Sequence, residues 1–400
     1  MKETEYSSPS CRRRAGTTES TTTIGGTDVS HERWPVAGSE REMTDHPRGT
    51  RVAADRIRSF IRDALVAVGV PAQDAVVVGD LMARADIIGS DAHGIFRLPH
   101  YIARIRGGAL NLRPHIKVIR ETPATAVIDG DNALGHLVMN AAVQTALGKA
   151  AACGIAWVGA FNSNHAGAGA VYTRMALERD MVGIYGAVAS GNAMAPFGGA
   201  DLLLGTNPIS VAIPTARGAP VVLDMATTVA SNGKIKHAAL RGESIPEGWV
   251  LDWQGNPITD PRRASDGFLA PAGGPKGSGL SLVLGLLAGS LNGARMGSAV
   301  VNFNTDFHSA TNTGHFICVL SLSAFGDPEE LKERMSTAAD EIRSSRPLGP
   351  NGPVRVPGDE SSRKLAENNS NGVFLPDELI KSLNSLAEEL GLPPLLGLGP

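Results

Sequence analysis

The sequence predicts an α/β fold that lacks a Rossmann-type sheet, and three observations support this prediction. Short strand patterns alternate with amphipathic helical patterns along most of the chain, which is typical of α/β proteins. The 400 residues include 47 glycines but only 4% aromatic residues, as expected for many close-packed turns. The G-x-G-x-x-G fingerprint of Rossmann domains is absent, since Gly167 and Gly169 are spaced as G-x-G but Tyr172 stands at the third glycine position.

The bulk composition limits the size class, the partners and the compartment. A chain of this length is expected to form two or three domains, at about 100–200 residues each. Its formal net charge of −3 gives no attraction to nucleic acid or to an anionic membrane. Cys11, Cys153 and Cys318 lie far apart without a metal-type spacing, and the most apolar segment, 280–291, is too short to span a bilayer. We therefore expect a cytoplasmic protein without a nucleic-acid or membrane partner.

The N-terminal part of the chain differs from the rest. Residues 1–50 are rich in Ser, Thr, Gly and charge and show almost no apolar periodicity. Such a segment cannot offset the entropy of ordering by burying apolar surface, so we predict a disordered extension. After it, apolar residues at helical spacing predict one helix over 52–68, ended by Gly69 and Pro71, and a second helix over 76–85.

A third helical pattern begins near Ile95 and ends at Gly107, with Pro99 near its start, where proline is tolerated. His93 and Arg97 are thus predicted to lie at a helix entrance. Beyond it, apolar patterns predict strands and helices in alternation. The predicted strands are 125–129, 155–160, 181–188, 209–213, 220–224 and 315–322. The predicted helices are 138–152, a segment containing Tyr172 and Leu177, 234–240, 279–291, 328–342 and 376–390.

The segment Ser-Asp-Ala-His-Gly-Ile-Phe-Arg at 90–97 is the first candidate site. Histidine exchanges a proton near neutral pH, as the interconversion of a carbonyl and an alcohol requires, and arginine binds a carboxylate with a planar fork. The pair His93 and Arg97 therefore suits a site for a 2-hydroxy acid. The alternative is a histidine that caps a helix and a solvated arginine.

The segment Asn-Ser-Asn-His-Ala-Gly-Ala-Gly at 162–169 is the second candidate site. It follows a predicted strand and precedes a predicted helix, so small residues such as Ala166 and Gly167 leave backbone amides open to a phosphate or a nicotinamide amide. A purely structural strand-to-helix loop that contains His165 is the alternative.

Two further glycine- and polar-rich regions interrupt the pattern. One runs from Ser190 through Gly-Thr-Asn-Pro at 205–208 and Leu-Asp-Met-Ala-Thr at 223–227 to Lys234, and its residues also suit ordinary turns. The other, Gly-Gly-Pro-Lys-Gly at 273–277, contains glycine and lysine in the wrong order for a phosphate loop. A lysine near a helix start could still contact a phosphate.

Taken together, the segments resemble the malate/L-lactate dehydrogenase type 2 family, which includes sulfolactate and ureidoglycolate dehydrogenases and reductases of piperideine-2-carboxylate. The match runs in order from about Val52 to the C-terminus. Its motifs are Asp-Ala-His-Gly-Ile-Phe-Arg-Leu-Pro, Asn-Ser-Asn-His-Ala-Gly, Ala-Pro-Phe-Gly-Gly, Gly-Thr-Asn-Pro, Leu-Asp-Met-Ala-Thr, Ile-Pro-Glu-Gly-Trp, Gly-Gly-Pro-Lys-Gly and Val-Pro-Gly-Asp-Glu.

The resemblance implies the non-Rossmann fold of L-sulfolactate dehydrogenase and a homodimer. It implies a helical substrate and dimerisation domain built from both chain ends, 51–122 and 315–400. It also implies a central NAD(P)-binding domain, 123–314, with a largely antiparallel sheet.

Site roles are carried over by position. The resemblance implies His93 or His165 as the proton carrier, and Arg97, Thr206 and Asn207 as substrate ligands. The implied cofactor-binding residues are His165, Ala166, Gly167, Ser190, Leu223, Asp224, Met225, Lys234, Gly274, Pro275, Lys276 and Gly358.

Three positions depart from the family pattern. Ala92 stands where many members have a serine before the catalytic histidine, so the orientation of His93 must come from another group. Lys234 stands where imine reductases of the family tend to have aspartate, which favours an alcohol or keto acid over a cyclic imine. Pro275 replaces a frequent aromatic residue.

We therefore expect hydride transfer between NAD or NADP and C2 of a small 2-oxo or 2-hydroxy acid of the malate, lactate, sulfolactate or ureidoglycolate type, without a bound metal. Three alternatives remain: a cyclic imine reductase of the same family, a protein that binds the cofactor without turnover, and a metal-dependent hydrolase. The hydrolase would use His93, His165 and either Asp91 or Asp224 as ligands.

Overall fold

The computed structural model describes residues 48–349 and 352–397. Most of the extension predicted over 1–50 therefore lies outside the described residues. Its last residues, Gly49 and Thr50, instead belong to strand β1 (Gly49–Val52), which pairs antiparallel with strand β12 (Val373–Pro376) near the other chain end.

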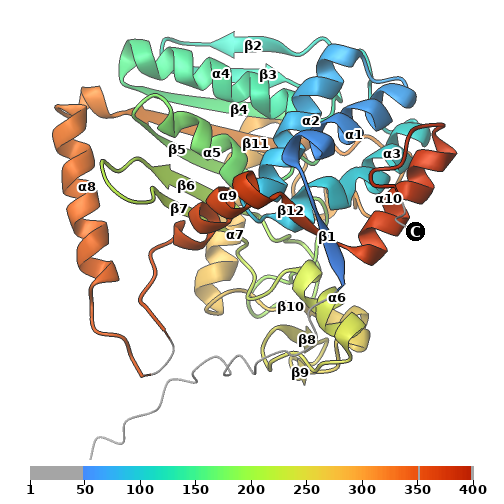
Figure 1. Cartoon of the computed structure of the whole chain (residues 1–400). Coiled ribbons are helices and arrows are strands. Elements are labelled where there is room, and N and C mark those ends of the chain that lie inside the picture. The colour runs from blue at the N-terminus through green and yellow to red at the C-terminus, as the bar shows by residue number, and fades with distance from the viewer. Residues whose placement is uncertain (1–47, 350–351, 398–400) are drawn as a thin grey trace, which may run out of the picture. The chain divides into compact units, whose positions relative to one another are not determined.

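The predicted alternation of helices and strands is confirmed in the structure (Figure 1). The helices are α1 (Ala54–Ala67), α2 (Ala72–Ile87), α3 (Leu98–Arg106), α4 (Gly135–Cys153), α5 (Gly169–Leu177), α6 (Asn232–Arg241), α7 (Pro275–Ala288), α8 (Pro328–Arg343), α9 (Asp359–Asn371) and α10 (Asp377–Glu389). The further strands are β2 (Lys117–Glu121), β3 (Thr125–Asp129), β4 (Ile155–Ser163), β5 (Met181–Ala187), β6 (Ile209–Ile213), β7 (Val221–Met225), β8 (Val250–Asp252), β9 (Pro257–Ile258), β10 (Gly267–Leu269) and β11 (Thr313–Ser321).

The central sheet has seven strands in the order β2-β3-β4-β11-β5-β6-β7. Within it only β3 and β4 run parallel, and every other neighbouring pair is antiparallel. This order excludes a Rossmann sheet, whose strands are mostly parallel. The predicted α/β class with a largely antiparallel sheet is therefore confirmed.

Strand β11 lies at the centre of this sheet, between β4 and β5. Eight of its nine residues are buried, because helices cover both faces of the sheet and no residue can point to water. Helices α4 and α5 pack on one face, where their apolar side chains join those of the strands in one core. Helix α7 packs on the other face through Leu284 and Ala288, which meet Phe316 of β11.

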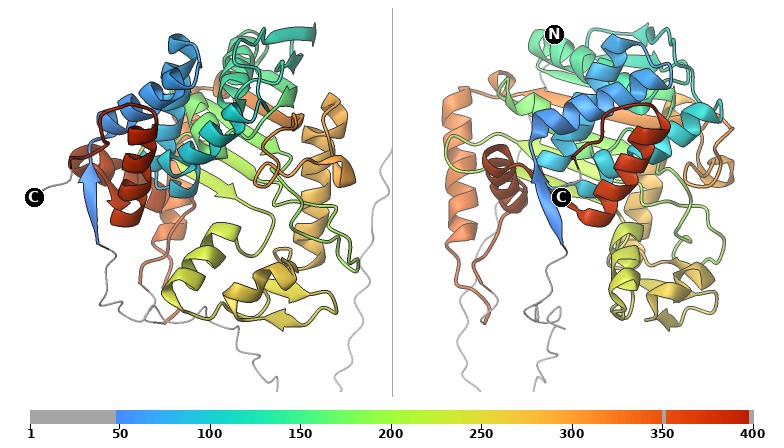
Figure 2. Two further views of the ribbon diagram at one scale, coloured as in Figure 1. Left: turned by 90° about the vertical axis from the view of Figure 1, so that its right-hand side faces the viewer. Right: turned by 45° about the vertical axis from the view of Figure 1, so that its right-hand side comes forward.

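A second core joins the two ends of the chain. Apolar side chains of α1, α2 and α3 pack with those of α10 and of the β1–β12 pair. Figure 2 shows the N-terminal helices in blue beside the red C-terminal helix. A third and smaller core, around Ile235 and Val250, joins α6 to the sheet of β10, β8 and β9.

Several elements were not predicted, and each lacks an apolar period. Strand β2 is exposed at every position because it forms an edge of the sheet. Helix α9 is almost entirely polar, and Asn368 is its only buried residue.

The helix predicted over 376–390 starts one residue too early, since Pro376 is the last residue of β12.

The predicted domain boundaries fall within the central sheet. Strand β2 lies just before the boundary at 122, and strand β11 spans the boundary at 314, yet both belong to the sheet that we expected within 123–314. The division into a helical and a cofactor-binding domain stays a prediction. No helix of the described residues is long and apolar enough to cross a membrane.

The position of β11 predicts that its side chains contribute strongly to stability. Ile317 is fully buried, so Ile317→Ala is expected to lower the free energy of unfolding by about 2–5 kcal/mol. Ile155, at the start of neighbouring β4, is 47% exposed, and Ile155→Ala is expected to cost about 1 kcal/mol or less. Urea unfolding of both variants measures the difference, and equal losses would contradict a central β11.

Candidate active site

The segment that carries His93 and Arg97 consists of two short 3-10 turns. The first turn, Asp91–His93, and the second, Ile95–Arg97, meet at Gly94 and lead directly into α3. The predicted helix entrance is therefore present, and Pro99 lies in the first turn of α3.

One hydrogen bond to the backbone and one to a side chain hold the guanidinium of Arg97. Its Nε donates to the carbonyl oxygen of Ala92 at 3.1 Å, and Nη1 donates to Oδ1 of Asn304 at 3.0 Å. Its Nη2 makes no hydrogen bond with the described residues. The fork is thus fixed in direction and retains N–H donors for an anion.

His165 lies between β4 and α5, as predicted, and the structure brings it together with His93. The two imidazole rings stack with their centroids 5.5 Å apart and an interplanar angle of 22°. The hydroxyl of Tyr101, a buried residue of α3, lies 2.5 Å from Nδ1 of His165. Because Nδ1 is engaged, Nε2 is the nitrogen of His165 left for exchange with another molecule.

Burial keeps these imidazoles neutral. It lowers the pKa of His93 to about 4, and the charge of Arg97 acts in the same direction. Burial, followed by the neighbouring His93 and Arg97, holds the pKa of His165 well below its ordinary value. Nδ1 of His93 is buried and has no hydrogen-bond partner among the described residues. Both residues are therefore in the neutral form, which carries a lone pair able to accept a proton or a hydrogen bond.

Two more buried histidines lie behind this pair. His136 packs edge-on against Tyr101, and burial lowers its pKa to about 3. His315 of β11 bonds through its ring nitrogens to the hydroxyl of Tyr185 and to the carbonyl oxygen of Asn164, each at 3.1 Å. Burial lowers the pKa of His315 to about 4.

A chain of contacts links the histidines to the predicted segment at 190–207. The ring of Phe303 lies 5.1 Å from that of His165, and its backbone N–H donates to the carbonyl oxygen of Ser190 at 2.8 Å. The side chain of Asn207 is used inside the protein, because it accepts from Ala189 N and donates to the carbonyl oxygen of Ser281. The carbonyl oxygen of neighbouring Thr206 accepts from Thr227. A substrate-binding role of Thr206 and Asn207 stays a prediction.

Close contacts with neighbouring side chains confine the loop that follows His165, and strand β7 holds the helix after it. Ala166 accepts a hydrogen bond from the Tyr172 hydroxyl at 2.5 Å, and Gly167, with φ of 78°, lies against His136. Asp224 of β7 accepts from the backbone N–H of Ala170 in the first turn of α5. Desolvation of this carboxyl group by the surrounding protein raises its pKa to about 6, although part of the residue is exposed to solvent.

Most of the other predicted cofactor residues lie on or beside four elements, which are β7, α6, α7 and α9. Leu223, Asp224 and Met225 form the second half of β7. Lys234 is exposed in the first turn of α6, beside Gly233, where an added Cβ would lie 3.9 Å from Ala92 of the His93 segment.

Helix α7 begins without a capping side chain. Gly274 is its N-cap residue, with φ of 64°, and Pro275 and Lys276 follow in the first turn. Gly358, the N-cap residue of α9, packs instead against Val222 of β7 and against Pro220, which precedes that strand.

Sequence reasoning missed several residues of the site. Tyr101 follows Arg97 at an interval of four, which places both on one helix face, but it reads as part of the apolar core pattern. Phe303 and Asn304 come from a loop about two hundred residues further along the chain, and no local signal connects them to Arg97.

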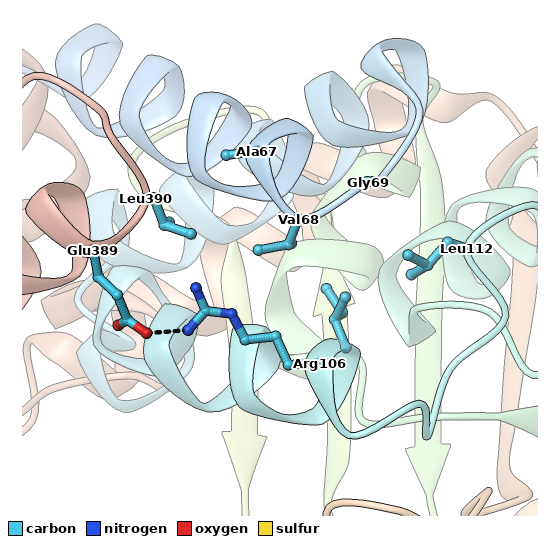
Figure 3. Close-up of a pocket in the computed structure, with 8 residues that line it drawn as sticks. Ala67, Val68, Gly69, Arg106, Leu112, Glu389 and Leu390 are labelled. Atoms are coloured by element: carbon cyan, nitrogen blue, oxygen red, sulfur yellow. Dashed lines mark hydrogen bonds and ion pairs between the residues drawn. The ribbon is translucent and has the colours of Figure 1, made fainter.

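Two further features of the described residues bear on other kinds of site. No group of three or more His, Cys, Asp or Glu side chains could hold a metal ion there. A cavity of about 550 Å³ lies away from the histidine pair, between α1, α3 and α10 (Figure 3). Apolar residues line it, and the ion pair of Arg106 with Glu389 crosses one side.

The comparison with known families decides the identity of the chain. The sequence profile of malate/L-lactate dehydrogenase matches residues 52–384. The chain belongs to the malate/L-lactate dehydrogenase family. The resemblance inferred from the eight sequence motifs is therefore confirmed.

Relatives in this family carry several dehydrogenase names. An L-sulfolactate dehydrogenase of Methanothermobacter thermautotrophicus is 36% identical over 86% of this chain and 98% of its own. A malate dehydrogenase of Pyrococcus horikoshii is 37% identical over 86% of this chain and 97% of its own. A ureidoglycolate dehydrogenase (NAD(+)) of Escherichia coli is 30% identical over 84% and 95% of the two chains.

Solved structures of the family superpose on this one. The sulfolactate dehydrogenase of Methanocaldococcus jannaschii gives a TM-score of 0.80 at 36% identity, over 86% of this chain and 98% of its own. The δ1-piperideine-2-carboxylate reductase of Pseudomonas syringae gives 0.74 at 26% identity, over 84% and 100% of the two chains.

The buried histidines of this dehydrogenase-family fold predict sensitivity to acid. The pKa of histidine is about 6.5 in an unfolded chain, and burial lowers it to about 4 in His93 and about 3 in His136. The unfolded state therefore binds more protons as the pH falls below about 6.5, and the free energy of unfolding decreases until the folded pKa is reached.

Urea unfolding between pH 4 and pH 7.5, at intervals of about half a unit, measures this slope. Replacing His136 by Gln removes one such group, so His136→Gln is expected to reduce the slope by up to about 1.4 kcal/mol per pH unit. A slope identical to that of the unmodified protein would show that His136 is not held neutral by burial.

Proposed function

We propose that this protein transfers a hydride between NAD(P)H and C2 of a small 2-oxo or 2-hydroxy acid. The observation that carries the proposal is the stacked pair of neutral imidazoles, His93 and His165, beside the fixed guanidinium of Arg97. These groups match the two needs of the reaction, which are a proton carrier and a carboxylate ligand. The names of the relatives agree with this class of chemistry.

The residues present fit a dinucleotide cofactor. The start of α7 has no capping side chain and carries the exposed cation of Lys276 in its first turn, which together suit a phosphate group. The narrow loop at Ala166 and Gly167 lies next to the histidine pair and suits a flat amide-bearing ring. Once bound, the cofactor supplies or accepts the hydride. The relatives include enzymes named for NAD(+) and for NADP(+), and we propose no preference between the two.

We assign the carboxylate of the substrate to Arg97. Its Nε and one Nη1 hydrogen are held by Ala92 and Asn304, so the guanidinium cannot rotate freely. The remaining N–H groups can bind two carboxylate oxygens at once, which fixes the position of C2. Such a clamp lowers the barrier by holding the reacting atoms in line rather than by covalent chemistry.

We assign proton transfer to Nε2 of His165. A general base works best when a third group fixes its orientation, and Tyr101 does this for His165 at Nδ1. His93 has no such partner, since its Nδ1 is unpaired and Ala92 offers no hydroxyl. In our proposal His93 stays neutral and contacts the substrate oxygen as a hydrogen-bonding group.

The alternatives have less support. A cyclic imine reductase is favoured by the likeness to the piperideine-2-carboxylate reductase, but Lys234 stands where aspartate is expected in such enzymes. A hydrolase with His93, His165 and an aspartate as metal ligands has no support in the described residues, where no metal-binding group of three is found. A protein that binds the cofactor without turnover is an outcome of the following test.

The decisive experiment combines binding with turnover. Fluorescence titration with NADH and NADPH is expected to show binding of at least one nucleotide. Oxidation of malate, lactate, sulfolactate and ureidoglycolate is then screened with the matching oxidised cofactor. Absence of binding by both nucleotides would contradict the proposal. Binding without any turnover would favour the binding protein, and reduction of piperideine-2-carboxylate alone would favour the imine reductase.

A variant of Arg97 tests the assigned carboxylate site. Arg97→Ala removes charged hydrogen bonds that contribute about 1.5–3 kcal/mol, so the KM for the acid is expected to rise about 10- to 150-fold. Nucleotide binding should persist. Arg106→Ala is the control, because Arg106 is an exposed arginine at the opposite end of α3 and pairs with Glu389. Similar KM values for both variants would argue against Arg97 as the carboxylate ligand.

We further propose that the enzyme is cytoplasmic and forms a homodimer through α7. The segment 277–294 contains no charged residue, and one side of α7 packs on the sheet. The opposite side leaves Leu282, Val283 and Leu286 between 45% and 51% exposed. A helix that is apolar all round requires a second partner, and a second copy of the chain is the partner that the family implies. The free Cys153 and Cys318 suit a reducing compartment, and we expect no nucleic-acid partner.

The α7 interface predicts the effect of a charge on assembly. Val283→Asp is expected to shift the protein from twice the mass of one chain to the mass of one chain in light scattering after gel filtration. The charge would be buried unpaired on association, which is strongly unfavourable. Val76→Asp, at an equally exposed apolar position of α2, is the control and should stay dimeric. Dimers of Val283→Asp would place the interface elsewhere.

A further inference from the structure

A buried carboxylate lies against the segment that carries His93 and Arg97. Asp86 is in the last turns of α2, and only 1% of its surface is exposed. Its Oδ2 accepts a hydrogen bond of 2.8 Å from the backbone N–H of Ile95, midway between His93 and Arg97. Among the described residues no cation pairs with Asp86, and burial raises its pKa well above the ordinary value. A buried carboxylate without a cation is costly, so its presence calls for a role.

The same carboxyl group determines the path of the backbone at Gly94. A Cβ at Gly94 would lie 1.8 Å from Oδ1 and 2.1 Å from Cγ of Asp86. The φ and ψ of Gly94 are −94° and −141°, and this ψ lies outside the main regions that other residues adopt. Glycine is therefore favoured here by the backbone conformation and also because the Asp86 carboxyl group occupies the space of a side chain, so that the loop lies directly on that group.

Asp86 is itself held from its other side. Asn368, the buried residue of α9, donates from Nδ2 to the carbonyl oxygens of Asp86 and Ile87 at 3.3 and 3.0 Å. The backbone of Asp86 is thus fixed by α2 and α9, independently of the loop that its carboxyl group contacts.

We propose that Asp86 is a positioning residue, which orients His93 and Arg97 by clamping the backbone of Gly94 and Ile95 between them. The inference rests on the function proposed above. The two 3-10 turns of the loop meet at Gly94, and each is closed by its own backbone hydrogen bond, donated by the N–H of His93 in the first turn and by the N–H of Arg97 in the second. Fixing Gly94 and Ile95 therefore fixes the angle between the two turns. This clamp supplies the orientation that a serine at position 92 would otherwise give.

Kinetics of Asp86 variants test the role in catalysis. Asp86→Ala removes the acceptor and is expected to raise the KM for the 2-hydroxy acid and lower kcat, each about tenfold or more, while the Kd for NAD(P)H changes less than about twofold. Asp86→Asn keeps an oxygen acceptor for Ile95 N–H and is expected to retain activity within about threefold. Asp80→Asn, at a half-exposed carboxylate of α2 paired with Arg58 and Arg84, is the control.

Two kinetic outcomes would overturn the proposal. One is unchanged KM and kcat in Asp86→Ala. The other is equal impairment of Asp86→Asn and Asp86→Ala, which would show that the negative charge matters and the hydrogen bond does not.

A stability measurement tests the clamp without turnover. Gly94→Ala is expected to destabilise the protein, because its Cβ would meet the Asp86 carboxyl group. In the Asp86→Ala background this clash is absent, so the effect of Gly94→Ala on the folding equilibrium constant should be smaller by about tenfold or more. Additive effects in urea unfolding would contradict the clamp. Lack of turnover by the unmodified protein would instead contradict the proposed function, so the two failures are distinguishable.

Discussion

The pairing of β11 between β4 and β5 is the constraint on which the rest of the structure depends. It inserts a segment from late in the chain between two strands that lie close in sequence, and buries that segment on both faces. The loop that precedes β11 is thereby drawn to the end of β4, where Phe303 meets His165 and Asn304 meets Arg97. The strand also places His315 behind the site, bonded to the carbonyl oxygen of Asn164. The central strand and the candidate active site are thus one structural unit.

Burial gives the site its chemical character. Four histidines lie close together, and the exclusion of water lowers the pKa of His93, His136, His165 and His315. A positive charge on any one of them would repel the guanidinium of Arg97 and would find few solvating groups. In the proposed function, the neutral imidazoles leave Arg97 as the charged group for the carboxylate of the substrate. The predicted sensitivity to acid and the proposed binding of an anion would then have the same origin.

Much of the fold could be predicted from the sequence, because most elements repeat apolar residues with a helical or strand period. Strands β3 and β6 match the predicted ranges 125–129 and 209–213, since apolar side chains alternate along them. Strand β2 and helix α9 could not be found, because an edge strand and a helix attached by Asn368 need no apolar stripe. In the site, His93, Arg97 and His165 were found because their residue types carry chemistry. Tyr101, Asp86 and Asn304 act through contacts set by tertiary packing, which leaves no local signal.

The pairing of β1 with β12 has a consequence for the synthesis of the protein. The helices around His93 are made early, but their core needs the side chains of α10 and of β12, which leave the ribosome last. Contacts between residues so distant in sequence form slowly, because a long loop must close before they contribute. The apolar faces of α1 and α2 are therefore without their final partner during most of translation. In that interval these exposed apolar faces make the nascent chain more prone to aggregation than the folded protein.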